Sequence, residues 1–189
     1  GFSYCYGSIY AWFRNLQGIY KITKGFYAMD FSKYSDMELI QIYGELLSKM
    51  REDRLIRSKN VTGDLGEYIV VDYYTKTKGL PKLQFAPPST KNIDAISVNG
   101  ERYSIKCITT NTTGAFYGIE KDTDINSIKP LFEYVVIIKL NENYQPEFIL
   151  ELDWEAFFKH KHWHSRIGAY NLLVTNSLIE DGKMIYKKN

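Results

Sequence analysis

The fold of this protein is decided by residues 92–108, which read NIDAISVNGERYSIKCI. Apolar and polar side chains alternate through most of this stretch, which is typical of β-strands. Asn99-Gly100 lies in its middle, and this dipeptide is a strong signal for a β-hairpin turn. We therefore predict one strand over residues 92–98 and a second over residues 101–109.

The length of the turn decides which side chains share a face of this hairpin. A regular two-residue turn would place Asp94 opposite Ile105, on the face away from Lys106. A three-residue loop with Gly100 in the left-handed conformation would place Asp94 opposite Ser104 and beside Lys106. Ser104 and Lys106 share a face in either case, because side chains two apart on a strand point the same way.

Lys106 is an unusual residue for its surroundings, because it interrupts an otherwise apolar strand. Burying an ammonium group is costly unless a carboxylate or a metal-bound anion compensates its charge. Asp94 would supply that carboxylate in the three-residue register. A site built on Asp94 and Lys106 therefore requires the three-residue loop, or another irregularity that shifts the strand pairing by one residue in the same way.

Two helices are expected before the hairpin. Ser35 and Glu38 form a capping-box pattern, so a helix should begin at Ser35, and apolar residues then recur at helical spacing as far as Met50. A second helix should begin near Thr62, its expected cap, and run to about Tyr74.

Glu67 lies near the start of the second expected helix. The residues three, four and seven positions further on are Val70, Val71 and Tyr74. A glutamate at such a place is often only solvated and favoured by the helix dipole. Because a hard divalent cation needs oxygen ligands from more than one element, we favour Glu67 as a metal ligand together with Asp94.

The rest of the chain predicts a mixed α/β domain over residues 35–189. Strands are expected at 134–140 and 146–152 and a helix at 154–159. The 189 residues are 44% hydrophobic and 24% charged, which suits one globular domain with a real core. Residues 1–34 form an aromatic and glycine-rich extension whose side chains could stack on bases but more often cover a core edge or a partner.

At these residues the chain resembles the PD-(D/E)XK nuclease superfamily, whose pattern is a helical Glu, an Asp at a strand start and Glu-x-Lys on the next strand. More narrowly, residues 62–68, 92–95 and 102–106 are similar to an uncharacterised bacterial family with Gln-x-Lys. The likeness covers residues 36–180. Ile93 stands where the superfamily has Pro, and Ser104 stands where a metal-binding acid or an amide is usual.

The resemblance implies a restriction-endonuclease-like core, a central mixed β-sheet flanked by helices. It also implies that Asp94 and Glu67 hold Mg²⁺, for which Mn²⁺ can substitute, and that Lys106 orients the attacking water. Ser104 would position that water or contact the metal weakly, so a higher Mg²⁺ requirement or an inactive site is expected. The implied substrate is double-stranded DNA, and a homodimer is expected by analogy with symmetric restriction sites.

Three further groups of residues carry side chains that could form a site. His160, His162 and His164 would share a strand face and suggest zinc, but we expect this stretch to continue the preceding helix, which leaves only His160 and His164 adjacent. With Arg166 these two would form a basic surface that contacts phosphates. Asn111, Thr112 and Thr113 form a polar loop that either contacts a nucleic-acid backbone or is merely a turn. Cys107 is expected to be a core residue.

Charge and cysteine content narrow the function only slightly. There are 24 Lys and Arg residues against 22 Asp and Glu, for a net charge of +2, which permits nucleic-acid binding without requiring it. The two cysteines support neither a disulfide framework nor a cysteine-based zinc site, and no apolar run is long enough to span a membrane. We expect a soluble cytoplasmic protein.

Three functions remain open on this basis. The first is a metal-dependent DNA endonuclease that hydrolyses phosphodiester bonds, of the restriction type. The second is a degenerate nuclease-like domain that binds nucleic acid without cutting it, as the serine at position 104 suggests. The third is a structural or protein-interaction module in which Asp94 and Lys106 are only a buried ion pair.

Overall fold

The computed structural model describes residues 30–188. The aromatic extension expected over residues 1–34 therefore lies almost wholly outside the described residues. The chain divides into two compact units, Gly1–Arg54 with the last two residues, and Leu55–Lys187. The second unit contains every candidate site residue.

The described part of the first unit consists of a short 3₁₀ helix, η1 (Phe31–Lys33), and the helix α2 (Asp36–Glu52). The predicted capping box is confirmed. Ser35 accepts a hydrogen bond from the Glu38 amide, and the Glu38 carboxylate accepts one from the Ser35 amide at 2.8 Å. This reciprocal bonding satisfies amides that a first helical turn would otherwise leave free.

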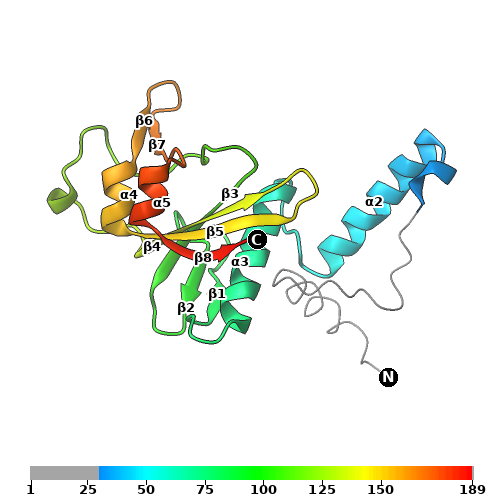
Figure 1. Cartoon of the computed structure of the whole chain (residues 1–189), viewed down its shortest axis with the longest axis horizontal. Helices are drawn as coiled ribbons and strands as arrows, with labels where there is room; N and C mark the ends of the chain where they lie inside the picture. Colours follow the sequence, from blue (N-terminus) through cyan, green and yellow to red (C-terminus); the bar gives the residue numbers. More distant parts are fainter. Residues whose placement is uncertain (1–29, 189) are drawn as a thin grey trace. The chain divides into compact units, whose positions relative to one another are not determined.

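The second unit is an α/β domain built on a six-stranded mixed sheet (Figure 1). In spatial order its strands are β1 (Leu83–Phe85), β2 (Ala95–Ser97), β3 (Arg102–Ile108), β4 (Tyr134–Leu140), β5 (Pro146–Asp153) and β8 (Lys183–Lys187). Only β3 and β4 pair in parallel; the other neighbours are antiparallel. The mixed sheet flanked by helices is as the sequence predicted.

Helices cover both faces of this sheet. The helix α3 (Val61–Lys76) packs against β3, with its Gly66 beside Cys107 and Ile138. The helices α4 (Trp154–His160) and α5 (Asn176–Asp181) lie on the other face, where alternate residues of β4 and β5 point toward them. Alternate side chains of β4 therefore pack into two separate layers, one toward α3 and one toward α4 and α5.

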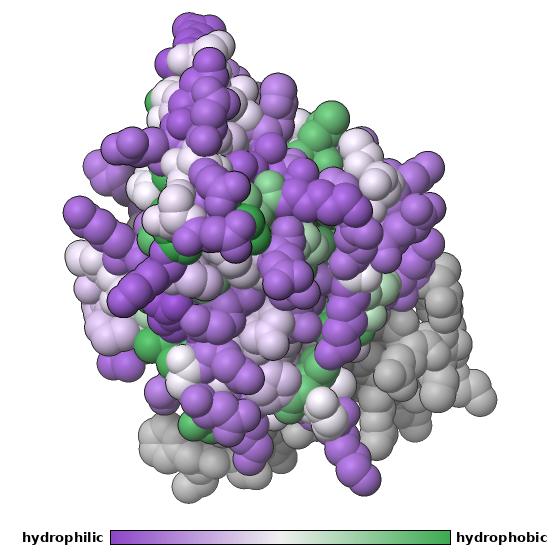
Figure 2. Space-filling view, turned by 90° about the vertical axis from the view of Figure 1, so that its left-hand side faces the viewer, coloured by the Kyte–Doolittle hydropathy of each residue, from purple (hydrophilic) through white to green (hydrophobic). Residues whose placement is uncertain are grey.

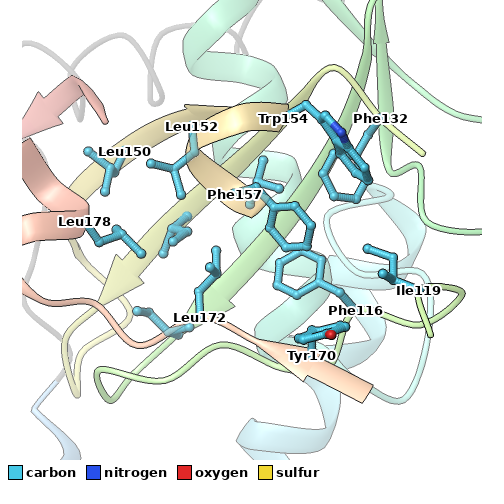
Figure 3. Close-up of a cluster of buried hydrophobic side chains, with 13 residues drawn as sticks. Phe116, Ile119, Phe132, Leu150, Leu152, Trp154, Phe157, Tyr170, Leu172 and Leu178 are labelled. Atoms are coloured by element: carbon cyan, nitrogen blue, oxygen red, sulfur yellow. The ribbon is translucent and has the colours of Figure 1, made fainter. Parts of the chain in front are cut away.

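The larger core lies between the sheet and α4. Figure 3 shows Phe116, Phe132 and Phe157 packed with Trp154 in one aromatic group, with Leu150 and Leu152 of β5 beside it. The Phe116 and Phe157 ring centroids are 4.8 Å apart and tilted by 54°. Such offset contacts are the preferred geometry of aromatic pairs, and they fix the segment around Phe116 against the sheet.

Most predicted elements are confirmed, with shifts at their ends. β4 has the expected bounds, β5 and α4 extend one residue further, and β2 is shorter, because residues 92–94 lie outside the strand. The expected cap Thr62 is wrong: α3 begins at Val61, and Asn60 caps it by accepting a hydrogen bond from Gly63 at 3.2 Å. Among the helices in the described part of the chain, none is long and apolar enough to cross a membrane.

The expected continuation of α4 through the histidines is also wrong. The helix ends at His160, and the chain then forms a small hairpin of β6 (His162–His164) and β7 (Ala169–Asn171). Trp163 pairs with Tyr170 across it, and their ring centroids are 5.0 Å apart. This hairpin pairing overrides the helical pattern of the preceding residues.

Candidate active site

The hairpin of β2 and β3 has the register that the site requires. Ala95 pairs with Tyr103, and the Ser97 amide donates to the Glu101 carbonyl at 2.8 Å, which leaves residues 98–100 as a three-residue loop. Gly100 has a φ of 90°, as expected for the left-handed position. The prediction of the looped hairpin is therefore confirmed, and the Asp94 carboxylate lies beside Ser104, whose hydroxyl is 3.5 Å from Asp94 Oδ2.

Backbone hydrogen bonds hold Asp94 at the start of β2. Its amide donates to the Tyr103 carbonyl at 2.8 Å, and its carbonyl accepts from the Ala86 amide at 2.9 Å. One carboxylate oxygen, Oδ2, accepts a hydrogen bond from the Ile105 amide at 2.7 Å. The carboxylate is thus directed across β3, toward the face that carries Ser104 and Lys106.

Ser104 is buried, with 1% of its surface exposed. Its hydroxyl lies 3.5 Å from Asp94 Oδ2, a long contact for an O–H···O hydrogen bond. The serine is therefore adjacent to the Asp94 carboxylate, as expected, but adds no charge to the site.

Lys106 carries its charge in a largely desolvated place. Burial lowers the pKa of its ammonium group, and the negative charges of Asp94 and Glu67 oppose that shift. Lys106 Nζ also lies 4.8 Å from the centroid of the Phe116 ring, a favourable cation–π arrangement. The ammonium thus lies over an aromatic ring and is within the electrostatic influence of both carboxylates.

A glycine brings α3 close enough to β3 to include Glu67 in this group. A side-chain carbon on Gly66 would lie 2.4 Å from Cys107 Cβ, so only glycine allows this approach. Burial, and then the charge of Glu67, raise the pKa of the Cys107 thiol to about 12. Cys107 is therefore a packing residue and a poor nucleophile, consistent with the role expected from the sequence.

The two carboxylates repel each other. Burial and then the charge of Asp94 raise the pKa of Glu67 to about 7, against the opposing effect of Arg57. A divalent cation between them would relieve this repulsion, so the pair suits a hard cation such as Mg²⁺. Within residues 30–188, no three His, Cys, Asp or Glu side chains come together in a metal-binding arrangement. Mg²⁺ needs only one or two protein carboxylates when water and substrate phosphate complete its coordination.

Two site residues were missed by sequence reasoning, Arg57 and Asp64. Asp64 is buried, and its Oδ2 accepts hydrogen bonds from the amides of Arg57 and Ser58. Arg57 Nη2 donates to Glu67 Oε2. The only sequence signal was a basic stretch before α3, followed by an acid three residues ahead of Glu67.

The polar loop predicted to touch nucleic acid lies where β3 leaves the sheet. Asn111 Oδ1 accepts a hydrogen bond from Lys139 Nζ at 3.0 Å, and Thr112 is exposed. Thr113 is buried, and its hydroxyl accepts a hydrogen bond from the Leu172 amide at 2.9 Å. The buried hydrogen bond of Thr113 therefore anchors the loop, and Asn111 and Thr112 are its solvent-exposed residues.

The histidines do not come together as a metal site. His160 Nε2 is hydrogen-bonded to Asp181, which also pairs with Lys159. His162 and His164 share a face of β6, and Arg166 lies exposed in the turn that follows. The face of the molecule in Figure 2 is mostly hydrophilic, with hydrophobic residues in small scattered patches.

No protein-family model matches the chain, and no curated protein is significantly similar to it. The arrangement of Glu67, Asp94 and Lys106 is therefore the basis on which a function is proposed.

Proposed function

We propose that this protein is a Mg²⁺-dependent DNA endonuclease with a restriction-endonuclease-like core of the PD-(D/E)XK type. The observation that carries the proposal is the looped hairpin, which brings the Asp94 carboxylate beside Ser104, two residues before Lys106 on the same strand. Glu67 joins them from a different element, and its charge acts on Lys106 as the charge of Asp94 does. Carboxylates from a helix and a strand start, with a lysine on the next strand, form the pattern of that superfamily.

Asp94 and Glu67 would hold the metal, and Mg²⁺ or Mn²⁺ when bound polarises the scissile phosphate and lowers the pKa of a coordinated water. The Ile105 amide fixes the orientation of the Asp94 carboxylate, so this ligand is preorganised. Glu67 is held by the packing of Gly66 against β3. Glu67 thus rests on a helix, and Asp94 is fixed by its hydrogen bonds directly before β2 begins.

Lys106 would act on the phosphate and the attacking water. Its ammonium group is largely excluded from solvent, so its charge is weakly screened where negative charge develops on the phosphate. The Phe116 ring beneath Nζ limits the directions in which the side chain can point. In this proposal Lys106 would orient the water and stabilise the pentavalent transition state.

A degenerate domain that binds DNA without cutting it is the second candidate. It is favoured by the neutral, buried hydroxyl of Ser104 at the place of a usual metal-binding acid. The experiment that separates the two candidates is incubation of the protein with plasmid DNA across a Mg²⁺ and Mn²⁺ series, with binding measured in parallel. Cleavage supports the endonuclease, whereas salt-sensitive binding without cleavage at any metal concentration supports the degenerate domain.

A further inference from the structure

We infer that Arg57 is a DNA-phosphate-binding residue of this site, and that its guanidinium exchanges Glu67 for a phosphodiester when the metal binds. The inference rests on the proposed function and adds a residue that the nuclease pattern does not contain. It predicts that Arg57 opposes metal binding in the free protein and promotes DNA binding once metal is present.

The backbone of Arg57 is fixed by a buried group. Asp64, with 7% of its surface exposed, accepts hydrogen bonds through one oxygen from the amides of both Arg57 and Ser58. Asp64 and Glu67 lie within one turn of α3, so the helix that presents the metal ligand also anchors the loop. Charge-assisted hydrogen bonds of this kind hold a loop firmly.

The side chain of Arg57 is also supported. Its Cζ atom lies 4.1 Å from the centroid of the Phe85 ring, so the guanidinium rests on an aromatic face. Phe85 pairs with Ala95 across β1 and β2, and Ala95 follows Asp94. The guanidinium is therefore held between Glu67 of α3 and Phe85 of β1, the strand that pairs with the one beginning after Asp94.

Arg57 keeps donors for a second partner. A guanidinium has five N–H groups, and through residues 30–188 only its bond from Nη2 to Glu67 is formed. The side chain is 36% exposed, whereas that of Glu67 is 20% exposed, so Arg57 lies on the solvent side of the pair. An arginine with free donors in this position matches the geometry of a phosphate.

The charges give the exchange its direction. Arg57 and Lys106 carry two formal positive charges against three negative charges on Asp64, Glu67 and Asp94, so a divalent cation on the carboxylates would change the group from net negative to net positive. Like-charge repulsion then weakens the pair between Arg57 and Glu67, while an incoming phosphate attracts the guanidinium. Metal and DNA binding are therefore coupled through Arg57.

The test compares wild-type protein with Arg57→Gln and with Lys59→Gln, an exposed basic residue of the same loop. Mn²⁺ affinity is measured by calorimetry without DNA, and affinity for a short duplex is measured in Ca²⁺ across a salt series. Arg57→Gln should tighten Mn²⁺ binding about threefold or more and weaken duplex binding about tenfold, with the log–log salt slope reduced by about one. Lys59→Gln should leave Mn²⁺ affinity unchanged.

Opposite effects on the two ligands are the signature of exchange, because a merely structural role would weaken both. Arg57→Lys should recover part of the duplex affinity, because lysine keeps the positive charge but lacks the paired donors of the guanidinium. Unchanged or weaker Mn²⁺ binding in Arg57→Gln, or an unchanged salt slope, would overturn the inference while leaving an Asp94-dependent nuclease intact. If wild-type protein binds no Mn²⁺ through Asp94, both the inference and the proposed function fail.

Discussion

The Asp94 carboxylate lies beside the Ser104 hydroxyl, with Oδ2 and Oγ 3.5 Å apart, because the loop of the β2–β3 hairpin contains three residues rather than two. This register places the carboxylate of Asp94 on the face of the hairpin that carries Lys106. A shift of one residue would send it to the other face of the sheet. The candidate site therefore depends on a turn that itself contains no site residue.

Gly100 maintains that turn, and replacing it should destabilise the domain. Its φ of 90° is unfavourable for any residue with a side chain, although a side-chain carbon there would meet nothing within 4 Å. Gly100→Ala should therefore lower the free energy of unfolding by about 1 kcal/mol through backbone strain alone. Gly114→Ala is the matched control, since Gly114 is equally unobstructed and does not have a positive φ. Equal stability of the two variants in urea unfolding would contradict this account.

Gly66 sets the distance between α3 and β3, so Gly66→Ala should be costly. The added carbon would lie 2.4 Å from Cys107 Cβ and 3.1 Å from Ile138 Cγ2, and α3 would have to move. We expect a loss of about 1–3 kcal/mol in unfolding free energy, as for overpacked cores, together with weaker Mn²⁺ binding because Glu67 moves with the helix. Gly44→Ala in α2 meets nothing within 4 Å and should be neutral or slightly stabilising. A Gly66→Ala variant with wild-type stability and metal affinity would refute the close-packing argument.

The raised pKa of Glu67 predicts how stability depends on pH without divalent metal. The folded protein holds a proton on Glu67 up to a pKa of about 7, whereas the unfolded chain releases it near 4.5. This contribution is complete below the unfolded pKa and is lost as pH rises through the folded one, a decrease on the order of 3 kcal/mol. Glu67→Gln cannot ionise, so its urea-unfolding free energy should fall less between about pH 5 and pH 8. Parallel pH profiles for the two proteins would exclude a strongly shifted Glu67.

Ser104 is the place where the site departs from the superfamily, and Ser104→Glu tests what that departure does. Position 104 is buried beside Asp94, so an added carboxylate should lower the melting temperature in a metal chelator. Mn²⁺ should then raise the melting temperature of Ser104→Glu by more than it raises that of the wild type, because the cation compensates the new charge. An equal Mn²⁺-induced shift in both proteins would mean that position 104 does not face the metal.

The sequence predicted the features that local chemistry determines. Ser35 and Glu38 defined the start of α2, and the hydrophobic pattern of β4 gave its bounds. The polarity of Asp94 and Lys106 in an apolar hairpin pointed to the register that the structure has. Each of these signals lies within a short stretch of chain.

The missed features depend on contacts between segments that no local sequence pattern links. β1 is three residues long and was too short to show a pattern, and the histidine stretch becomes a strand because Trp163 pairs with Tyr170. The place of Arg57 in the site depends on the hydrogen bond from its amide to Asp64 and the one from its side chain to Glu67. Sequence spacing carries no information on such pairings.

The central claim is that Asp94 and Lys106 form a metal-dependent nuclease centre. The most direct measurement is cleavage of plasmid DNA in Mg²⁺ and Mn²⁺ by the wild type, Asp94→Asn and Lys106→Met, with Glu142→Gln as an exposed carboxylate control. We predict metal-dependent cleavage by the wild type and the control, and a loss of at least about a hundredfold in both site variants while their folded structure is retained. Cleavage that persists in Asp94→Asn and Lys106→Met, or no cleavage by the wild type at any metal concentration, would contradict the claim.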